Sequence, residues 1–252
     1  IQYVVEEAVK SGIESVVIVT GRGKTTMEDH FDISFELEKL LEERGKQGEL
    51  KAMRAISEMA RVSYVRQREP LGLGHAVLQA RGCVEDEPFA VMLSDDIIDS
   101  ETPALKQLLD VYEKYDAPVL GTMQVEGEAI SRFGVIDADE VEDGVFKIKD
   151  MVEKPKFSEA PSDLAIIGRY VLTPDIFDEL ENTKPGAIGE IQITDAMRAL
   201  LRKRPFYAVR FEGTRYDAGD KLGFLIANVA FALKRPDLAD DFGQYLKTLN
   251  LQ

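Results

Sequence analysis

The chain has 252 residues, 44% of them apolar, which is enough for a hydrophobic core and argues against disorder. Its 46 acidic and 31 basic residues give a net charge of −15, which argues against a nucleic-acid partner because such surfaces need clustered positive charge. The chain has one cysteine, Cys83, and two histidines, which excludes an internal disulfide and a Cys/His zinc cage. It shows no long apolar run and no signal-peptide pattern, so we expect a cytoplasmic protein with no membrane partner.

The first half of the chain alternates between helical and strand patterns. Apolar residues at helical spacing predict a helix over 1–9, and no N-cap residue precedes it, so we expect an earlier strand and an N-terminally incomplete domain. The elements predicted next are a buried strand at VVIVTG (16–21), helices over 33–60 with a break at 45–48, a strand at VSYVRQ (62–67), a helix from about His75, a buried strand at FAVMLSDD (89–96), a helix with Thr102 as its cap and Pro103 at its start, and a strand at VLGTMQV (119–125). This alternation predicts a mostly parallel sheet covered by helices.

The second half begins with strand patterns alone. FGVIDAD (133–139), GVFKIKDMVEKP (144–155) and LAIIGRYVL (164–172) are separated by Gly and Asp turns, which predicts hairpins that extend the sheet. Helical patterns follow over about 190–201, 222–233 and 236–249, and the second of these carries an apolar stripe of Leu222, Leu225, Ile226, Val229 and Leu233. We therefore predict a single α/β domain over 1–252, Rossmann-like, with a mostly parallel mixed sheet flanked by helices.

Ligands of open α/β sheets bind at the carboxyl ends of the parallel strands, so the residues just after each strand are candidates for a site. Gln67 ends one predicted strand and is followed by the turn GLGHA over 72–76. Glycines there let the backbone approach a base or a phosphate. A strand-to-helix turn with two glycines and no ligand is about equally consistent with the pattern. No third glycine stands at 77, so the visible chain lacks the dinucleotide fingerprint of a nicotinamide dehydrogenase.

Two aspartates are candidate metal ligands. Asp95 follows a predicted buried strand, and Asp217 follows the strand-like run FYAVRF. Carboxylates from separate strand ends suit Mg²⁺, which takes oxygen ligands and bridges phosphates. The alternatives are a capping role for Asp95 and an Asx-type turn at Asp217 beside Gly219.

Glu153, Lys154 and Pro155 come directly after another predicted strand. A lysine suits a phosphate monoester as a point charge, and a glutamate can accept hydrogen bonds from two sugar hydroxyls. Taken alone, this tripeptide is more typical of an exposed turn in which proline ends the strand.

Together, and in this order, these features resemble the sugar-phosphate nucleotidyltransferases, and most closely the bacterial UTP–glucose-1-phosphate uridylyltransferases. The matching stretches run nearly end to end: IQYVVEEAVKSGI, TGRGKTTMEDHFD, QREPLGLGHAVL, VMLSDDII, SRFGVI, VEKP, IIGRYVL, GEIQITDA and YDAGDKLGFLIANV. QREPLGLGHA and MEDHFD are similar to the uridylyltransferase branch rather than the thymidylyltransferase branch.

The resemblance implies a role for each matching residue, with Asp95 and Lys154 the most direct participants in the reaction. Gln67 and Gly72 would contact uracil, with the turn through Gly74 holding the base, and Asp95 and Asp217 would bind Mg²⁺. Gly134 would meet the sugar through its backbone, Glu153 would bind sugar hydroxyls, and Lys154 would bind the sugar phosphate. Gly168 and Arg169 would lie along the sugar pocket. It also implies a homo-oligomer, a dimer or tetramer, with the C-terminal helices over about 220–252 as contacts.

The implied reaction is an in-line attack of glucose 1-phosphate on the α-phosphorus of UTP, which gives UDP-glucose and pyrophosphate without a protein nucleophile. The family's glycine-rich loop, with its Thr-Arg pair and a following lysine, does not precede IQYVVEEA, so we expect the intact protein to carry it. Two alternatives remain at this point. One is a non-catalytic, regulatory paralogue that binds nucleotide sugars, and the other is a related thymidylyl- or cytidylyltransferase.

Overall fold

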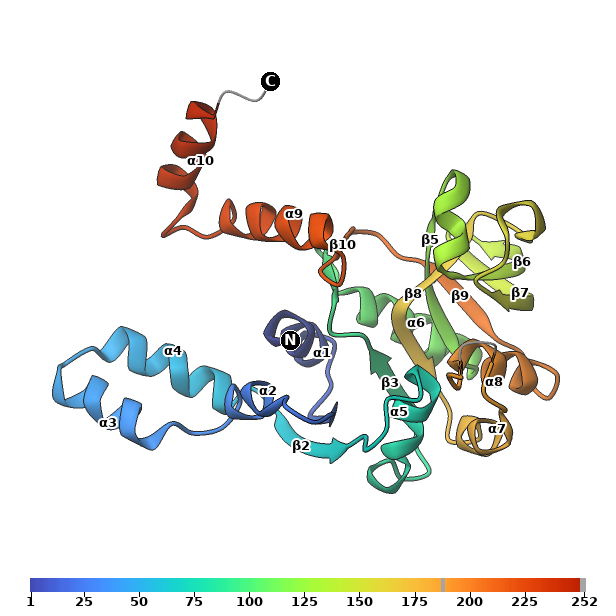
Figure 1. Cartoon of the computed structure of the whole chain (residues 1–252), viewed down its shortest axis with the longest axis horizontal. Coiled ribbons are helices and arrows are strands. Elements are labelled where there is room, and N and C mark those ends of the chain that lie inside the picture. Colours follow the sequence, from blue (N-terminus) through green and yellow to red (C-terminus); the bar gives the residue numbers. More distant parts are fainter. Residues whose placement is uncertain (187–188, 250–252) are drawn as a thin grey trace.

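The computed structural model describes residues 1–186 and 189–249 (Figure 1). Its N-terminal part holds α1 (Gln2–Lys10), β1 (Ser15–Thr20), α2 (Thr25–Asp29), α3 (Phe35–Glu43), α4 (Gln47–Ser57) and β2 (Arg61–Arg66). β1 and β2 pair in parallel, and Val5 of α1, Ile18 of β1 and Phe31 form the centre of a small core beside them. β1 is only partly buried, with Ile18 and Thr20 inside, because β1 and β2 form a two-stranded sheet of their own.

A six-stranded mixed sheet forms the centre of the molecule, in the order β3-β8-β5-β9-β7-β6. Its strands are β3 (Phe89–Met92), β5 (Val119–Gln124), β6 (Gly134–Glu142), β7 (Val145–Glu153), β8 (Leu164–Leu172) and β9 (Tyr207–Arg210). The apolar run of β8 lies in the middle of this sheet, and all its residues are buried. The strand directions follow from the pairings: β3, β5, β6 and β9 run one way, and β7 and β8 run the other.

The predicted α/β fold with a mixed sheet is thereby confirmed. Four strands share one direction, yet β5–β9 is the one parallel pairing among the described strands of this sheet, because β7 and β8 separate the others. Both reversed strands come from the segment in which strand patterns follow one another without a helix. Short connections between strands require antiparallel neighbours, so the hairpins change the pairing pattern without changing the fold class.

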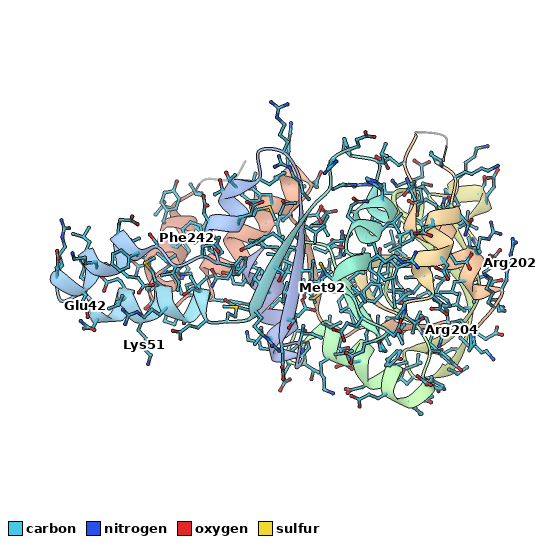
Figure 2. All side chains as sticks on the ribbon, turned by 90° about the horizontal axis from the view of Figure 1, so that it is seen from below. Glu42, Lys51, Met92, Arg202, Arg204 and Phe242 are labelled. Carbon is cyan, nitrogen blue, oxygen red and sulfur yellow. The ribbon has the colours of Figure 1, made fainter. Side chains whose placement is uncertain are left out.

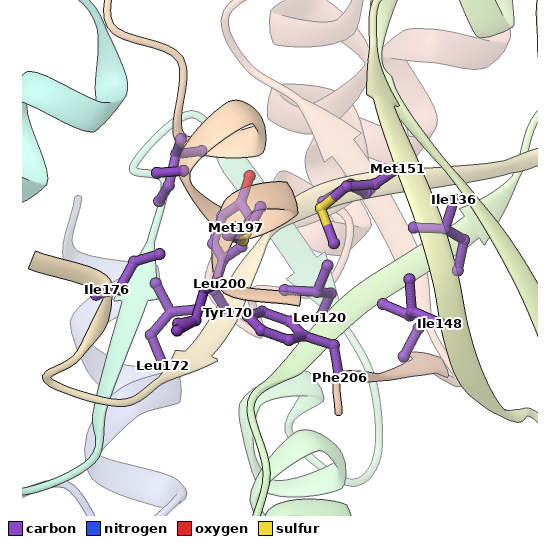
Figure 3. Packing of buried hydrophobic residues seen from close by; sticks show 14 of the residues in the cluster. Leu120, Ile136, Ile148, Met151, Tyr170, Leu172, Ile176, Met197, Leu200 and Phe206 are labelled. Carbon is purple, nitrogen blue, oxygen red and sulfur yellow. The ribbon is translucent and has the colours of Figure 1, made fainter. Parts of the chain in front are cut away.

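Helices cover both faces of the central sheet. On one face lie α5 (Leu73–Gln79), α7 (Ile176–Asn182) and α8 (Ile193–Leu201), and on the other lies α6 (Ala104–Tyr115) together with α1. Alternate residues of β8 serve the two cores, since Tyr170 and Leu172 face α7 and α8 while Val171 faces α6. Figure 3 shows Tyr170, Leu172 and Met197 in the first core, which packs the central sheet against α7 and α8.

Two further strands, β4 (Asp96–Asp99) and β10 (Thr214–Asp217), form an antiparallel pair beside the central sheet. Short 3₁₀ turns occur at Arg81–Cys83, Gly127–Arg132 and Phe157–Glu159. The chain then continues into α9 (Lys221–Ala232) and α10 (Ala239–Thr248), which project away from the sheet in Figure 1. Figure 2 shows the resulting elongated shape, with Glu42 and Lys51 near one end and Arg202 near the other.

Two local predictions need correction. α6 begins at Ala104 after Pro103, and Thr102 does not cap it; instead the carboxylate of Glu7, from α1, accepts a hydrogen bond from the Leu105 amide at 3.0 Å. α5 begins at Leu73, two residues before His75, because Gly72 with φ 94° forms its N-terminal turn. The predicted apolar stripe of α9 is present and exposed, because little of the described chain covers that helix, whose buried residue is Ala227.

Candidate active site

A pocket of about 380 Å³ opens where β3, β6, β7 and β8 approach β10. It collects residues from distant parts of the sequence, from Leu73 at the start of α5 to Asp217 at the end of β10. The lining comes from the carboxyl ends of β3, β7 and β10, from the start of β6 and from the middle of β8, so the pocket is not confined to the carboxyl ends of parallel strands. Polar groups dominate the lining, which suits a charged and hydroxylated ligand better than an apolar one.

Asp95 and Asp217 lie next to each other on one wall of this pocket. The pairing of β4 with β10 sets Asp217 opposite Asp96, and the backbone oxygen of Asp95 accepts a hydrogen bond from the Ala218 amide at 2.7 Å. A Cβ atom at Gly219 would stand 2.7 Å from Asp95 Oδ2 and 3.3 Å from Asp217 Oδ1, so this glycine keeps the space beside both carboxylates open. Asp217 Oδ1 also accepts from the Gly219 amide at 3.1 Å, so the Asx-type turn coexists with the open carboxylate pair.

Asp96 and Arg215 form a buried polar support beneath that pair, and sequence reasoning missed both as site residues. Arg215 donates to Asp96 Oδ1 at 2.6 Å and to Asp217 Oδ2 at 3.2 Å, and its guanidinium lies over the ring of Phe133. Asp96 Oδ2 accepts from the Gly168 amide at 2.7 Å. Because Arg215 and Asp217 are two apart in one strand they share a face, and this spacing was the available signal.

Glu153 and Lys154 occupy the opposite wall. Thr194 donates its hydroxyl to Glu153 Oε2 at 2.7 Å, and Lys154 Nζ lies 3.6 Å from Glu153 Oε1. Gly134 packs beside them, since a Cβ there would stand 3.1 Å from Thr194 Oγ1 and 3.2 Å from Glu153 Oε2. Lys154 has φ 44°, an uncommon conformation for a non-glycine residue, and its amide donates to the Phe133 oxygen at 3.0 Å.

Tyr170 and Gly168 contribute the floor of the pocket from β8. Burial raises the pKa of Tyr170, so its hydroxyl stays protonated at any physiological pH. A Cβ at Gly168 would stand 2.5 Å from Asp96 Oδ2 and 2.6 Å from Leu93 Cβ. Only glycine therefore lets β8 approach the loop that carries Asp95.

Gln67 and Gly72 lie in the connection between β2 and α5, and Gly74 is the second residue of α5; Leu73, between the two glycines, lines the pocket. The turn is packed against 190–191: the Gly74 amide donates to the Ile191 oxygen at 2.9 Å, and a Cβ at Gly74 would stand 2.7 Å from that oxygen. Gly72 is equally crowded by Glu190. The packing of the turn therefore requires glycine at both positions, whether or not a ligand binds there.

Arg169 was predicted to lie along the sugar pocket, and this prediction is wrong for its side chain. Arg169 is fully buried and points away from the pocket lining. It donates to both carboxylate oxygens of Glu7, at 3.0 and 2.8 Å, and to the backbone oxygens of Leu93, Gly168 and Asp96. The physical reason is that a charge in an apolar strand needs a partner, and the helix α1 supplies one.

Over 1–186 and 189–249, no group of three or more His, Cys, Asp or Glu side chains could hold a metal ion. The acidic residues that line the pocket are Asp95, Asp96, Glu153, Glu190 and Asp217. Within the same ranges, every helix is too short or too polar to cross a membrane.

The pocket combines carboxylates whose oxygens could hold a cation with a lysine whose charge could bind a phosphate. Residues 1–232 match the family described as Nucleotidyl transferase, and the chain belongs to that family.

Relatives with high similarity share a single description. The UTP–glucose-1-phosphate uridylyltransferase YngB of Bacillus subtilis is 51% identical over 98% of this chain and 83% of its own length. The UTP–glucose-1-phosphate uridylyltransferase of Staphylococcus epidermidis is 49% identical over 100% of this chain and 87% of its own length.

Solved structures give the same result. A UDP-glucose pyrophosphorylase complexed with UDP-glucose superposes with a TM-score of 0.84 at 46% identity, over 93% of this chain and 86% of the other. The UTP-bound enzyme from Acinetobacter baumannii superposes with a TM-score of 0.91 at 36% identity, over 99% of this chain and 87% of the other.

Proposed function

We propose that this protein transfers a uridylyl group from UTP to glucose 1-phosphate, giving UDP-glucose and pyrophosphate. The observation that carries the proposal is the agreement of sequence and structure. Relatives of this name are about half identical along nearly the whole chain, and the UDP-glucose-bound structure has the same fold. The pocket adds the chemistry that such substrates require, with a lysine for a phosphate and carboxylates for hydroxyls and a cation.

The wall formed by Glu153, Lys154 and Gly134 is assigned to the sugar phosphate. Thr194 holds one oxygen of Glu153, which leaves the other to accept hydrogen bonds from sugar hydroxyls. The half-exposed ammonium of Lys154 suits the phosphate as a point charge. The neutral hydroxyl of Tyr170 is a further donor on the floor, and Gly168 lets the backbone approach the sugar.

The turn with Gln67, Gly72 and Gly74 is assigned to the uracil base. Gln67 follows β2 and is hydrogen-bonded to Gly72, so the side-chain amide and the glycine backbone form one edge beside Leu73. An amide can form hydrogen bonds with the polar edge of a flat base while the glycines leave room for its face.

Nucleotidyl transferases generally use a divalent metal ion, and the residues here fit Mg²⁺. Asp95 and Asp217 supply hard oxygen ligands, and Gly219 keeps the space between them open. Mg²⁺ in proteins is usually held by one or two carboxylates together with phosphate oxygens of the substrate. The site therefore does not need three protein ligands, and no group of three was found among the described residues. When bound, the ion supplies neutralisation of phosphate charge.

The chain's own residues then position the reactants. Lys154 and Glu153 hold glucose 1-phosphate, and the β2–α5 turn holds the nucleotide, so that the sugar-phosphate oxygen attacks the α-phosphorus and pyrophosphate leaves. A phosphoryl or nucleotidyl transfer of this kind needs positioning and charge stabilisation rather than a protein nucleophile.

Pyrophosphate release tests the proposal. The protein expressed from its full gene is given glucose 1-phosphate and Mg²⁺ with UTP, dTTP, CTP or ATP in separate reactions. Rapid release with UTP alone is expected. Release with dTTP or CTP instead would identify a thymidylyl- or cytidylyltransferase, and no release from a folded protein would favour a non-catalytic, regulatory paralogue.

A homo-oligomer, a dimer or tetramer, is part of the proposal, with a second copy of the chain covering α9 and α10. Four large apolar residues of α9 are 49–65% exposed, and three of them belong to its apolar stripe: Leu222, Leu225 and Ile226 of the stripe, with Phe224 on another side of the helix. A contiguous apolar surface of this kind marks an interaction site in a monomeric fold. Residues 250–252 of the predicted contact region lie outside the described residues.

A cytoplasmic location is also proposed, since the one cysteine, Cys83, is a free thiol and suits a reducing compartment.

A further inference from the structure

A continuous line of polar contacts joins four residues at the base-binding turn. Gln67 Nε2 lies 3.2 Å from the Gly72 carbonyl oxygen and 2.9 Å from His75 Nδ1. On the far side of the imidazole, Gln79 Nε2 lies 3.2 Å from His75 Nε2. Gln67, His75 and Gln79 are each partly buried, so these contacts are shielded from competing water.

The Gly72 carbonyl fixes the direction of this line. A carbonyl oxygen can only accept, so the group that Gln67 presents to it must be the NH₂ half of its amide. That NH₂ group has two hydrogens, and its second acceptor is His75 Nδ1. Turning the amide over would place its oxygen against the carbonyl and leave two acceptors facing each other.

The tautomer of His75 follows from that direction. Nδ1 must carry a lone pair to accept from Gln67, so the single proton of the neutral ring is on Nε2. An Nε2–H group needs an acceptor. If the side-chain amide of Gln79 is rotated by 180°, its Oε1 and Nε2 exchange places, and Oε1 then accepts from Nε2–H of His75. Gln67 Oε1 is then the amide atom that remains for a ligand, since no other described residue donates to it.

We propose that His75 is a positioning residue that holds Gln67 with its amide oxygen toward the base, and thereby favours uracil over cytosine in the nucleotide. Uracil carries a hydrogen at N3 and donates to that oxygen, whereas the N3 of cytosine is a lone pair that faces it. The inference rests on the proposed uracil role of Gln67 and adds the reason for its orientation.

Variants of His75 test the proposal through nucleotide discrimination rather than activity alone. The ratio of kcat/KM for UTP to kcat/KM for CTP is measured for the wild type, His75→Leu and His75→Asn. His75→Leu removes the acceptor, and the ratio is expected to fall about tenfold. Asn offers an oxygen near the Nδ1 position, so His75→Asn is expected to stay within about threefold of the wild type. An unchanged ratio in His75→Leu, or an equal fall in both variants, would overturn the proposal.

The ring tautomer provides a test that needs no catalysis. The chain has two histidines, and His30 is exposed, so a His30→Gln variant assigns the signals in a long-range ¹H–¹⁵N spectrum of the ligand-free protein. A proton on Nε2 of His75 is expected, and a proton on Nδ1 would overturn the proposal even if His75→Leu does not fold. Failure of the wild type to use UTP would contradict the proposed function instead, while the tautomer still decides the orientation of Gln67.

Discussion

Two adjacent aspartates between β3 and β4 lie in opposite environments. Asp95 is exposed in the pocket, whereas Asp96 is buried and paired with Arg215 and the Gly168 amide. Asp95→Asn is therefore expected to lower Mg²⁺-dependent turnover about 100-fold or more without changing the melting temperature, because it removes a ligand and no packing.

Asp96→Asn is the matched comparison. It leaves Arg215 with one carboxylate fewer in a buried setting, and it is expected to cost about 3 kcal/mol of unfolding free energy. Kinetics and urea unfolding of both variants measure the two effects. A stable, fully active Asp95→Asn protein would show that the metal assignment is wrong.

Lys154 combines a charge with an unfavourable backbone conformation. Lys154→Ala is expected to raise the KM for glucose 1-phosphate about tenfold or more, since it removes the cation facing the phosphate and leaves UTP binding unchanged. Lys154→Gly should raise the KM equally but be more stable than Lys154→Ala by about 1 kcal/mol, because glycine adopts φ 44° without strain. Steady-state kinetics with thermal unfolding checks both. An unchanged KM would make this residue a surface turn.

The residues that sequence reasoning found and those it missed differ in a physical way. Glu153 ends β7, Lys154 follows it, and Asp95 lies in the short loop after β3, so a local pattern was enough to find them. Arg215 and Thr194 act through contacts with residues far away in the chain, and these depend on the pairing of β4 with β10 and the packing of α8 on β7. A single sequence does not contain those pairings.

At the scale of elements, the buried Arg169–Glu7 pair connects three of them. Arg169 in β8 binds Glu7 of α1, and Glu7 also accepts from the Leu105 amide at the start of α6. The same guanidinium donates to the backbone oxygens of Leu93 and Asp96, on either side of Asp95. The pair therefore holds the loop of Asp95 against the central sheet.

Arg169→Met is expected to destabilise the protein by about 3–5 kcal/mol, since it leaves the Glu7 carboxylate buried without its charged partner. The double variant Glu7→Gln/Arg169→Met removes both charges and should recover part of that loss. Urea unfolding of the single and double variants measures the coupling. A single variant as stable as the wild type would contradict the structural role, and a selective rise in the KM for glucose 1-phosphate would restore the sugar-pocket prediction.

Helix and strand positions were largely predictable because their apolar periodicity is local, and α1, α3, α4, α6 and β5 lie within a few residues of expectation. Caps and burial were less predictable. The cap of α6 comes from Glu7, and β1 looked like a fully buried strand although one face of its pair is open. In both cases the deciding partner is distant in sequence.

At the scale of the whole molecule, the pocket and the exposed surface of α9 occupy different parts of the fold. The pocket lies among the strands, whereas α9 and α10 follow the end of β10 that carries Asp217 and project away from the central sheet (Figure 1). α9 is connected to the pocket through Asp217 and Asp220, and Asp220 accepts from the first amides of the helix. An interface on α9 would therefore hold the end of β10, and with it Asp217, in place.

The oligomer gives the last prediction. Light scattering after size exclusion is expected to give a mass of two or four times 28.1 kDa, and Leu225→Asp with Ile226→Asp should give the single-chain mass, because two charges cannot be buried in an apolar interface without partners. Val141→Asp is the control: Val141 is also exposed, at 43%, but it stands alone on the β6–β7 hairpin, and its variant should keep the oligomer. A wild-type protein that is monomeric at micromolar concentration would contradict the assigned interface. The double variant is also expected to need more Mg²⁺ for half-maximal turnover. That result would show that the interface on α9 helps to hold Asp217 in place.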